Sequence, residues 1–288
     1  MKQARRSSAQ PSWLILTDLD GTLLDATTYS AEAAREALAA MRARKIPLIL
    51  SSSKTRAELE TIRARLGHQD PFITENGGGV FIPAGTFPSP VPEAVRRGPY
   101  DVLEIGTPYP VLRRALEDIG RELGCPLKGF GDMSPEDIAD RTGLSPGDAA
   151  LAKQREYNEP FLVEGPGQPD PNLIRTLQQL AHARGLQCTR GGRFFHLLGR
   201  SDKGASARRL IQLYRISLEG TGLRLRTAAL GDSLNDRPML AAVDQPIVVQ
   251  RPDGSYDPDL NLSQVIYAPG IGPIGWNRAV LDLVTDHG

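Results

Sequence analysis

Short apolar runs alternate with segments of helical periodicity in the first part of the chain. Residues 13–17 are an apolar run typical of a strand buried on both faces of a sheet. Residues 30–45 repeat apolar side chains at helical spacing, and a capping box of Thr55 and Glu58 begins a second helix. The predicted elements here are strands at 13–17, 46–50, 72–75 and 80–82 and helices at 30–45 and 55–67. Such repeated strand, helix, strand units predict a parallel sheet with right-handed crossovers.

The same alternation returns after residue 196. Asp202 can cap a helix whose apolar side chains, from Ala207 to Tyr214, share one face. The elements predicted after it are strands at 227–230 and 246–249, a short helix at 237–243 and a terminal helix at 277–285. We therefore predict an α/β fold with a doubly wound parallel-sheet core, similar to a Rossmann fold, built from both ends of the chain.

The middle of the chain has a different pattern. Prolines and glycines concentrate at residues 83–99, which is typical of a linker. Helical spacing returns at 111–123 and 172–184, with turns and the apolar stretch 161–163 between them. We interpret this region as a small α+β insert. The predicted parts are a flexible polar tail at 1–12, a core domain at 13–83 and 197–288, and an inserted cap domain at 84–196.

Composition and charge exclude several classes of protein. Hydrophobic residues make up 40% of the 288 residues, and lysine plus arginine equals aspartate plus glutamate at 34 each. A balanced charge lacks the basic excess of a dedicated nucleic-acid binder. The sequence has no apolar run of about 18 residues that could span a membrane, and no apolar signal segment follows its first basic residues. The two cysteines, Cys125 and Cys188, are too few for a disulfide framework. We expect a cytoplasmic protein with a small-molecule partner, and the oligomeric state stays open.

Polar side chains suited to chemistry follow the predicted strands. Asp18 and Asp20 follow the first strand, and Ser52 follows the second. Asp232 follows the first strand after the insert, and Lys203 opens the helix before it. Ligands of open parallel sheets bind beyond the carboxyl ends of the strands, so we expect these groups to converge. A set of solvated turn residues is the plain alternative. Together, however, three carboxylates suit Mg²⁺, and a lysine beside them suits a phosphoryl group.

The order of these residues resembles the haloacid dehalogenase superfamily of phosphatases. The matching motifs are Asp-x-Asp-x-Thr at 18–22, Ser52, Lys203 and Gly-Asp-Ser-x-Asn-Asp at 231–236. A large α/β cap between the serine and the lysine is typical of the Cof-type members of that superfamily. A carboxylate at Asp20 favours phosphatase or phosphomutase chemistry over that of the dehalogenases and transport ATPases in the superfamily.

The resemblance implies a role for each motif residue. Asp18 would be the nucleophile that accepts the phosphoryl group, and Asp20 would be the general acid and then the general base. Ser52 and Lys203 would hold the phosphoryl oxygens. Of the metal ligands, Asp20 would use its backbone carbonyl, and Asp236 would orient a bound water or the lysine. The implied catalytic residues are Asp18, Asp20, Ser52 and Lys203, and the implied Mg²⁺ site is Asp18, Asp20, Asp232 and Asp236.

A closer resemblance, over most of the chain, is to the mannosyl-3-phosphoglycerate phosphatase family. It rests on Ser-Ser-Lys-Thr at 52–55, Glu-Asn-Gly-Gly at 75–78, Arg-Glu-Tyr-Asn-Glu-Pro-Phe at 155–161 and Gly-Gly-Arg-Phe at 191–194. It implies a phosphorylated sugar as substrate and synthesis of mannosylglycerate, a compatible solute. The implied substrate-binding residues are Lys54, Asn76, Arg155, Glu159, Gly191, Gly192 and Arg193.

Alternatives stay open for the substrate and for several of these residues. Arg155 and Arg193 can offer a carboxylate a bidentate fork, but they can equally form structural ion pairs. Lys54 can be a solvated lysine of a first helical turn. The substrate can be glucosyl-3-phosphoglycerate or another sugar phosphate, and a non-catalytic sugar-phosphate sensor is an alternative of another class. Retention of both Asp18 and Asp20 argues against the sensor, since binding alone requires neither a nucleophile nor an acid.

Overall fold

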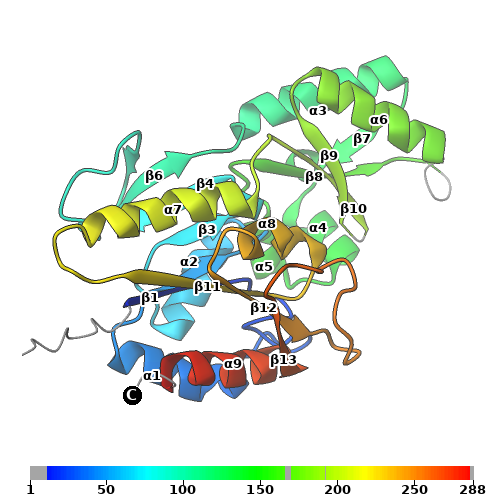
Figure 1. Ribbon diagram of the computed structural model, residues 1–288. Helices are drawn as coiled ribbons and strands as arrows, with labels where there is room; N and C mark the ends of the chain where they lie inside the picture. The colour runs from blue at the N-terminus through cyan, green and yellow to red at the C-terminus, as the bar shows by residue number, and fades with distance from the viewer. Residues whose placement is uncertain (1–11, 166–169, 192, 286–288) are drawn as a thin grey trace, which may run out of the picture.

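A nine-stranded sheet forms the larger part of the structure, a computed structural model that describes residues 12–165, 170–191 and 193–285 (Figure 1). Its strands are β1 (Ser12–Thr17), β2 (Leu48–Ser51), β3 (Phe72–Thr74), β4 (Gly79–Pro83), β5 (Val95–Arg97), β6 (Tyr100–Glu104), β11 (Leu225–Gly231), β12 (Gln245–Gln250) and β13 (Ile266–Ile271). They lie in the order β13, β12, β11, β1, β2, β3, β4, β6, β5. The pairs from β13 to β3 are parallel and those from β3 to β5 antiparallel, so the predicted parallel core is confirmed.

Helices cover both faces of the large sheet (Figure 1). The helices on this part are α1 (Arg35–Ala43), α2 (Arg56–Leu66), α7 (Lys203–Ser217), α8 (Arg237–Leu240) and α9 (Pro273–Thr285), with the 3₁₀ turns η1 (Glu32–Ala34), η2 (Glu75–Gly77) and η4 (Leu234–Asp236). In β1, Trp13 and Ile15 pack with α1, α2 and α9, whereas Leu14 and Leu16 pack with α7 and α8. Because both sets of side chains are buried, the strand reads as a continuous apolar run.

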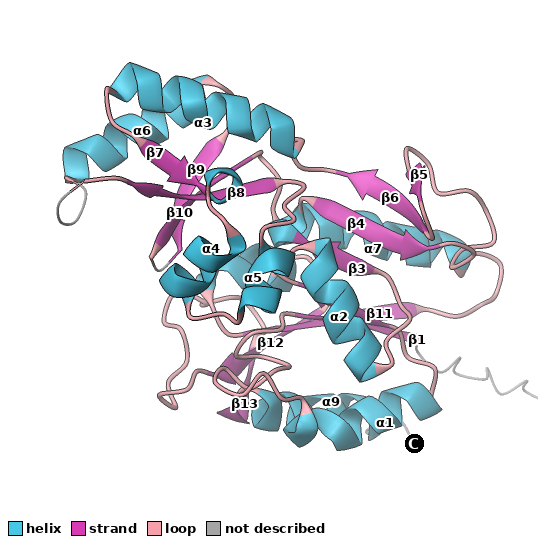
Figure 2. Cartoon of the chain, turned by 180° about the vertical axis from the view of Figure 1, so that it is seen from behind, coloured by secondary structure: helices cyan, strands magenta, loops and turns pink. Residues whose placement is uncertain are grey.

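A second, antiparallel sheet lies beyond one end of the large one (Figure 2). Its strands are β7 (Leu127–Gly129), β8 (Asn158–Val163), β9 (Gln187–Gly191) and β10 (Phe194–Leu198), in the order β7, β8, β10, β9. The other elements here are α3 (Tyr109–Leu123), η3 (Phe130–Asp132), α4 (Pro135–Thr142), α5 (Pro146–Ala152) and α6 (Pro171–Ala183). Leu112 and Leu177 pack α3 and α6 with Phe161 and Phe195 of the sheet. Among the described helices, none combines the length and the apolar character that crossing a membrane requires.

The structure corrects the predicted boundaries of the insert. Residues 95–104, which we assign to the cap from the sequence, form β5 and β6 of the large sheet, and β6 pairs with β4 over five residues. The proline-rich sequence hides this hairpin because β5 is exposed and polar. At the other end, β10 spans the predicted boundary between residues 196 and 197. Ser12, predicted as the end of the tail, begins β1, and the rest of that tail lies outside the described residues.

His68, just after α2, is held as a neutral imidazole. Its Nδ1 accepts a hydrogen bond from Nε of Arg63 at 3.0 Å, and its Nε2 lies 2.6 Å from the carbonyl oxygen of Leu48. Since Nδ1 accepts, Nε2 carries the proton and donates. Burial, to which the charge of Arg63 adds, lowers the pKa of His68 from its usual 6.5 to about 4.

We expect acid to destabilise the protein through His68. Between pH 6.5 and pH 4 the unfolded chain binds a proton at this residue that the folded chain excludes, so the free energy of unfolding falls as the pH drops. The slope from this group reaches about 1.4 kcal/mol per pH unit. Urea unfolding at pH 7, 6 and 5 measures it, and His68→Gln should show a smaller slope whatever its stability at pH 7. Equal slopes in the two proteins would contradict the assignment.

Candidate active site

The carboxyl ends of three adjacent strands bring the predicted catalytic side chains together. β1 lies between β2 and β11 in the sheet, and the backbone N–H of Asp18 donates to the carbonyl of Leu230 at 2.9 Å. Ser52 follows β2 and Asp232 follows β11, so these side chains and Asp18 lie at one edge of the sheet. All three residues are buried. This convergence is what the order of strands and polar residues predicts.

Lys203, the first residue of α7, bridges two carboxylates. Its Nζ lies 2.5 Å from Oδ1 of Asp18 and 2.6 Å from Oδ1 of Asp236, and its side chain is fully buried. Asp202 caps α7 as predicted, because its Oδ1 accepts a hydrogen bond from the N–H of Ala205 at 2.7 Å. Burial opposes the charge of Lys203, but attraction to Asp18 and Asp236 outweighs it and raises the pKa of the ammonium group. The lysine is therefore charged at neutral pH.

Three buried carboxylates crowd around this single lysine. Oxygens of Asp18, Asp232 and Asp236 lie within 4.8 Å of one another. Burial, followed by repulsion from Asp236, raises the pKa of Asp18 well above its ordinary value and that of Asp232 to about 6. One ammonium group cannot neutralise three carboxylates, and hard oxygen donors suit a divalent cation. The residues present therefore fit a metal site, to which the side chain of Asp20 does not contribute.

The turn after β1 is shaped to the side chain of Asp232. Thr22 Oγ1 donates a hydrogen bond to Asp232 Oδ1 at 3.0 Å. Gly21 has φ +78°, and a Cβ there would lie 3.1 Å from Oδ2 of Asp232. A side chain at Gly21 would therefore be strained and crowd the carboxylate. The Gly-Thr sequence after the two aspartates thus orients a third carboxylate that lies 210 residues further along the chain.

Asp20 faces the opening of the site and forms an ion pair with Lys54. Lys54 Nζ lies 3.0 Å from Oδ2 of Asp20, and the side chains are 15% and 38% exposed, respectively. Burial opposes the charge of Lys54, but Asp20 and Glu58 outweigh it and raise the pKa of the lysine. The other oxygen of Asp20, Oδ1, is buried and has no hydrogen-bond partner among the described residues. The plain alternative of a solvated Lys54 is wrong, since this lysine is bound to a carboxylate of the site.

The loop after β3 holds Ser52 and the start of α7 in place. The backbone N–H of Asn76 donates to the carbonyl of Ser52 at 3.0 Å, and Ser52 Oγ accepts from the N–H of Lys54 at 3.2 Å. Gly77 has φ +97°, and a Cβ there would lie 2.2 Å from the backbone oxygen of Asp202. Only glycine permits this approach of the loop to α7. Asn76 itself reaches the Asp232 loop, since its Oδ1 accepts from Asn235 at 3.4 Å.

The two predicted substrate-binding arginines bind backbone carbonyls. Arg155 donates to the carbonyl of Ser53 at 3.0 Å and to that of Ala152 at 2.7 Å, and its side chain is 9% exposed. Arg193 is exposed and donates to the carbonyl of Arg141. Arg155 thus joins the Ser52 loop to the end of α5. Gly191 ends β9, and Gly192 lies outside the described residues.

Glu159, a residue of β8 in the second sheet, is fully buried and bound to a cation. Its Oε1 accepts from Nη1 of Arg113 at 2.7 Å and from the N–H of Gly131 at 3.1 Å. Burial nevertheless raises the pKa of this carboxyl. Its Oε2 has no hydrogen-bond partner among the described residues. As observed, Glu159 holds β8 to the loop after β7.

Glu75, to which the sequence pattern gives no role, joins the large sheet to the chain that enters the second sheet. Its carboxylate accepts hydrogen bonds from the backbone N–H groups of Glu156 at 2.8 Å and Tyr157 at 3.1 Å. It is buried, with φ +48°, and burial raises its pKa to about 7. A possible signal is an acidic residue directly after an apolar strand and before Asn-Gly. The carboxylate anchors the chain where it enters β8.

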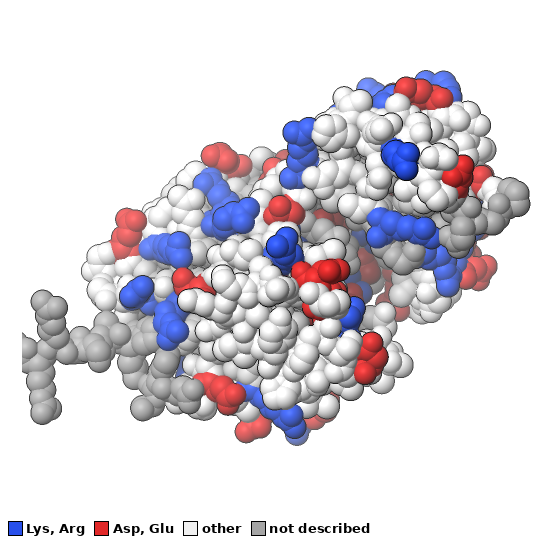
Figure 3. Space-filling model, turned by 45° about the vertical axis from the view of Figure 1, so that its right-hand side comes forward, with Lys and Arg blue, Asp and Glu red and all other residues white. Residues whose placement is uncertain are grey.

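The surface is hollowed between the two parts of the molecule (Figure 3). Both acidic and basic side chains gather along this hollow rather than charges of one sign. A lining that holds both acidic and basic side chains fits a small charged ligand that contacts side chains of both signs.

Known proteins share both the sequence and the fold. The family model for haloacid dehalogenase-like hydrolases matches residues 15–85. A glucosyl-3-phosphoglycerate/mannosyl-3-phosphoglycerate phosphatase from Methanococcoides burtonii is 47% identical over 94% of this chain and 97% of its own. One from Persephonella marina is 36% identical (95% and 97% covered), and a mannosyl-3-phosphoglycerate phosphatase from Pyrococcus furiosus is 37% identical (80% and 88% covered).

Solved structures with low sequence identity share the fold. BT1666 from Bacteroides thetaiotaomicron, a phosphatase of the haloalkanoate superfamily, superposes with a TM-score of 0.63 at 17% identity, covering 98% of both chains. The subclass IIB sugar phosphatase BT4131 gives 0.61 at 16% identity, covering 94% of this chain and 98% of its own. Both comparisons extend over the large sheet and the second sheet alike.

Proposed function

Since the chain belongs to the haloacid dehalogenase-like hydrolases and is a phosphatase, we propose that it hydrolyses mannosyl-3-phosphoglycerate to mannosylglycerate and phosphate. Glucosyl-3-phosphoglycerate is the second proposed substrate, because two of the relatives are named for both compounds. The observation that carries the proposal is the buried cluster of Asp18, Lys203, Asp232 and Asp236, with Asp20 beside it at the opening.

The proposed reaction has two steps, both of which use Asp18 and Asp20. In the first, a carboxylate oxygen of Asp18 attacks phosphorus, the bond from phosphorus to the glycerate oxygen breaks, and Asp20 gives that oxygen a proton. In the second, Asp20 takes a proton from water as the water oxygen displaces Asp18 from phosphorus. The partial exposure of Asp20 supports this role, because it leaves the carboxylate accessible to the oxygen of the leaving group. The Ser52 hydroxyl and the Lys203 ammonium group hold the phosphoryl oxygens.

We propose Mg²⁺ as the ion of this site. Asp18, Asp232 and the backbone carbonyl of Asp20 would hold it, and it would supply positive charge to the phosphoryl oxygens. Asp236 is placed to orient its neighbours, since its Oδ2 accepts from the backbone N–H of Asp232 at 3.1 Å while its Oδ1 binds Lys203. The crowding of three buried carboxylates supports a bound cation.

The second sheet and its helices are proposed to act as a cap over this site. Two hydrogen bonds join the loop after β2 to α5 and the residues that follow it, which supports this role. Arg155 donates to the carbonyl of Ser53, and Thr55 Oγ1 donates to the carbonyl of Leu151 at 3.0 Å. Lys54 and Asn76 lie beside catalytic groups and remain proposed substrate-binding residues. Gly191, Gly192 and Arg193 remain so from the sequence motif alone. Arg155 and Glu159 would shape the site through their structural contacts.

Phosphate release from a substrate panel tests the proposed function. The panel holds both glycosyl-3-phosphoglycerates, 3-phosphoglycerate and simple sugar phosphates, each assayed with Mg²⁺ and with EDTA. We expect the highest kcat/KM for the glycosyl-3-phosphoglycerates and a loss of about 10²-fold or more with EDTA, restored by Mg²⁺. Preference for simple sugar phosphates would refute the proposed substrate, and full activity in EDTA would refute the proposed metal.

A further inference from the structure

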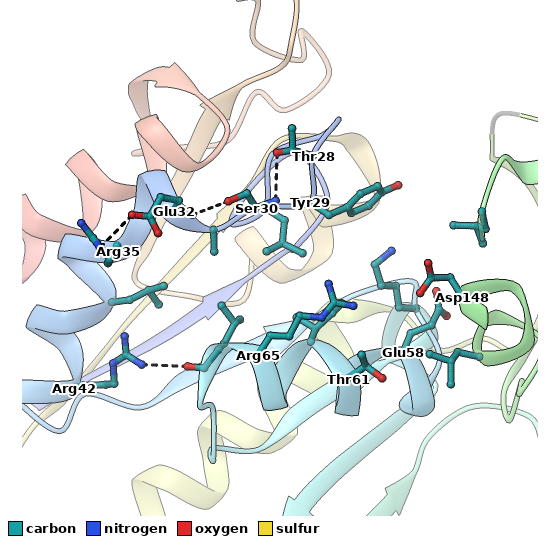
Figure 4. Close-up of a pocket in the computed structure, with 18 residues that line it drawn as sticks. Thr28, Tyr29, Ser30, Glu32, Arg35, Arg42, Glu58, Thr61, Arg65 and Asp148 are labelled. Atoms are coloured by element: carbon teal, nitrogen blue, oxygen red, sulfur yellow. Dashed lines mark hydrogen bonds and ion pairs between the residues drawn. The ribbon is translucent and has the colours of Figure 1, made fainter. Parts of the chain in front are cut away.

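A pocket of about 560 Å³ lies where α1 and α2 of the large sheet's part meet α5 (Figure 4). Its walls come from the loop before α1, from α1 and α2, and from α5, which belongs with the second sheet. The volume lies in the range of small-molecule sites. Leu144 and Leu151 contribute apolar surface from α5 and its approach, and Thr55 holds α5 to the core through its hydrogen bond to Leu151. Both parts of the molecule therefore build this pocket.

Lys54 connects the pocket to the reaction. It lines the pocket while its Nζ lies 3.0 Å from the carboxylate of Asp20. In the proposed reaction Asp20 protonates the oxygen of the leaving group, so the organic part of the substrate begins at this carboxylate. A leaving group that extends from Asp20 past Lys54 enters the pocket directly.

Tyr29 presents an aromatic face at this end of the pocket. Its side chain is 47% exposed, and its ring centroid lies 5.2 Å from Lys54 Nζ. Its φ is +55°, a conformation that a non-glycine residue rarely adopts. The loop enforces it: Asp25 Oδ1 accepts from the N–H groups of Thr27 and Thr28, and the N–H of Tyr29 donates to the carbonyl of Asp25. Strained backbone conformations cluster at active sites and ligand clamps, so an exposed aromatic ring on such a residue is a candidate ligand contact.

Carboxylates line the pocket opposite the aromatic ring. Glu58 of α2 and Asp148 of α5 lie at the same end as Tyr29 (Figure 4). Each retains acceptor capacity: Glu58 Oε2 accepts from Thr55, and Asp148 Oδ2 accepts from Ser145. Carboxylates repel a second phosphate group but accept hydrogen bonds from hydroxyl groups. Arg35, Arg42 and Arg65 also line the pocket, in addition to Lys54. An aromatic face and carboxylate acceptors beside Lys54 match a polyhydroxyl ring attached to an acid.

We propose that this pocket binds the hexosyl group of the substrate, with Tyr29 packing on the sugar ring and Asp148 accepting a hydrogen bond from its hydroxyl groups. Lys54 faces the carboxylate of the glycerate between the sugar and the phosphate. The proposal rests on the proposed function and adds the residues that select the sugar. Because Asp148 belongs to α5 and Tyr29 to the loop before α1, the hexosyl group contacts both parts of the molecule.

The test is the ratio of kcat/KM for mannosyl-3-phosphoglycerate to kcat/KM for 3-phosphoglycerate, which lacks the hexosyl group. We expect Tyr29→Ala to lower this ratio about tenfold or more and Asp148→Asn to lower it about threefold or more. Tyr29→Phe, which keeps the ring, should stay close to the wild type. The matched controls are Tyr267→Ala, a tyrosine 44% exposed on β13, and Asp259→Asn, an exposed aspartate outside the pocket. Both controls should leave the ratio unchanged.

The outcomes separate this proposal from the proposed function. A wild type that prefers the glycosyl compound, with the ratio retained in Tyr29→Ala and Asp148→Asn, overturns the pocket assignment and leaves the proposed function standing. A wild type with no preference for the glycosyl compound overturns both. A ratio that falls equally in the control variants also overturns the assignment, because the effect then does not arise in the pocket.

Discussion

Replacing Asp18 with asparagine should lower kcat by about 10⁴-fold or more while the protein stays folded. The amide removes the attacking oxygen anion but keeps the size of the side chain. Lys203 retains Asp236 as a partner at 2.6 Å, and the loss of one of three crowded carboxylates relieves repulsion. We therefore expect a free energy of unfolding equal to or above that of the wild type. Steady-state phosphate release and urea unfolding measure the two quantities.

Asp20→Asn, compared with Asp18→Asn, shows which aspartate is the nucleophile and which is the general acid and base. With p-nitrophenyl phosphate, whose leaving group needs little protonation, this variant should still transfer the phosphoryl group to Asp18 and then stall. Rapid mixing should show a burst of nitrophenolate close to one equivalent per enzyme, followed by slow turnover. Asp18→Asn should show no burst. A burst in Asp18→Asn, or a kcat near that of the wild type, would show that another group is the nucleophile.

The catalytic cluster could be predicted from the sequence because it depends on the backbone more than on side-chain packing. Asp18 and Asp232 each follow an apolar strand, and parallel strands end at the same edge of a sheet. The position of Lys203 could be predicted because Asp202 caps α7, and the residue after a cap is the first residue of its helix. The strand order that puts β1 between β2 and β11 then completes the arrangement.

The residues around the substrate could not be predicted in the same way. The same arginine motif can bind a ligand or a backbone carbonyl, and the packing of α5 on the core directs Arg155 to Ser53. Glu159 similarly meets Arg113, which lies 46 residues away in the sequence. The sequence does not indicate the role of Glu75, because its partners are backbone N–H groups, which any residue type other than proline can supply. The β5–β6 hairpin was missed because its exposed strand lacks an apolar pattern.

Lys203→Met should lower the free energy of unfolding by about 3–5 kcal/mol at neutral pH and abolish phosphatase activity. The side chain is fully buried, and its removal leaves Asp18 and Asp236 close together without the ammonium group that now separates them. Burial and mutual repulsion already raise the pKa of Asp18 well above its ordinary value, and the loss of the lysine raises it further. A divalent cation should restore part of the stability by binding the folded form alone.

The pH dependence and a second substitution distinguish charge from packing as the cause. A carboxyl whose pKa is raised in the folded protein contributes stability at low pH and loses it as the pH rises through that value. Lys203→Met should therefore fall further below the wild type between pH 5 and pH 8. Adding Asp236→Asn removes one uncompensated charge, while the amide oxygen can still accept from the N–H of Asp232, and this should recover a large share of the loss. If the loss is independent of pH and the double variant recovers nothing, the lysine acts by filling space and not by its charge.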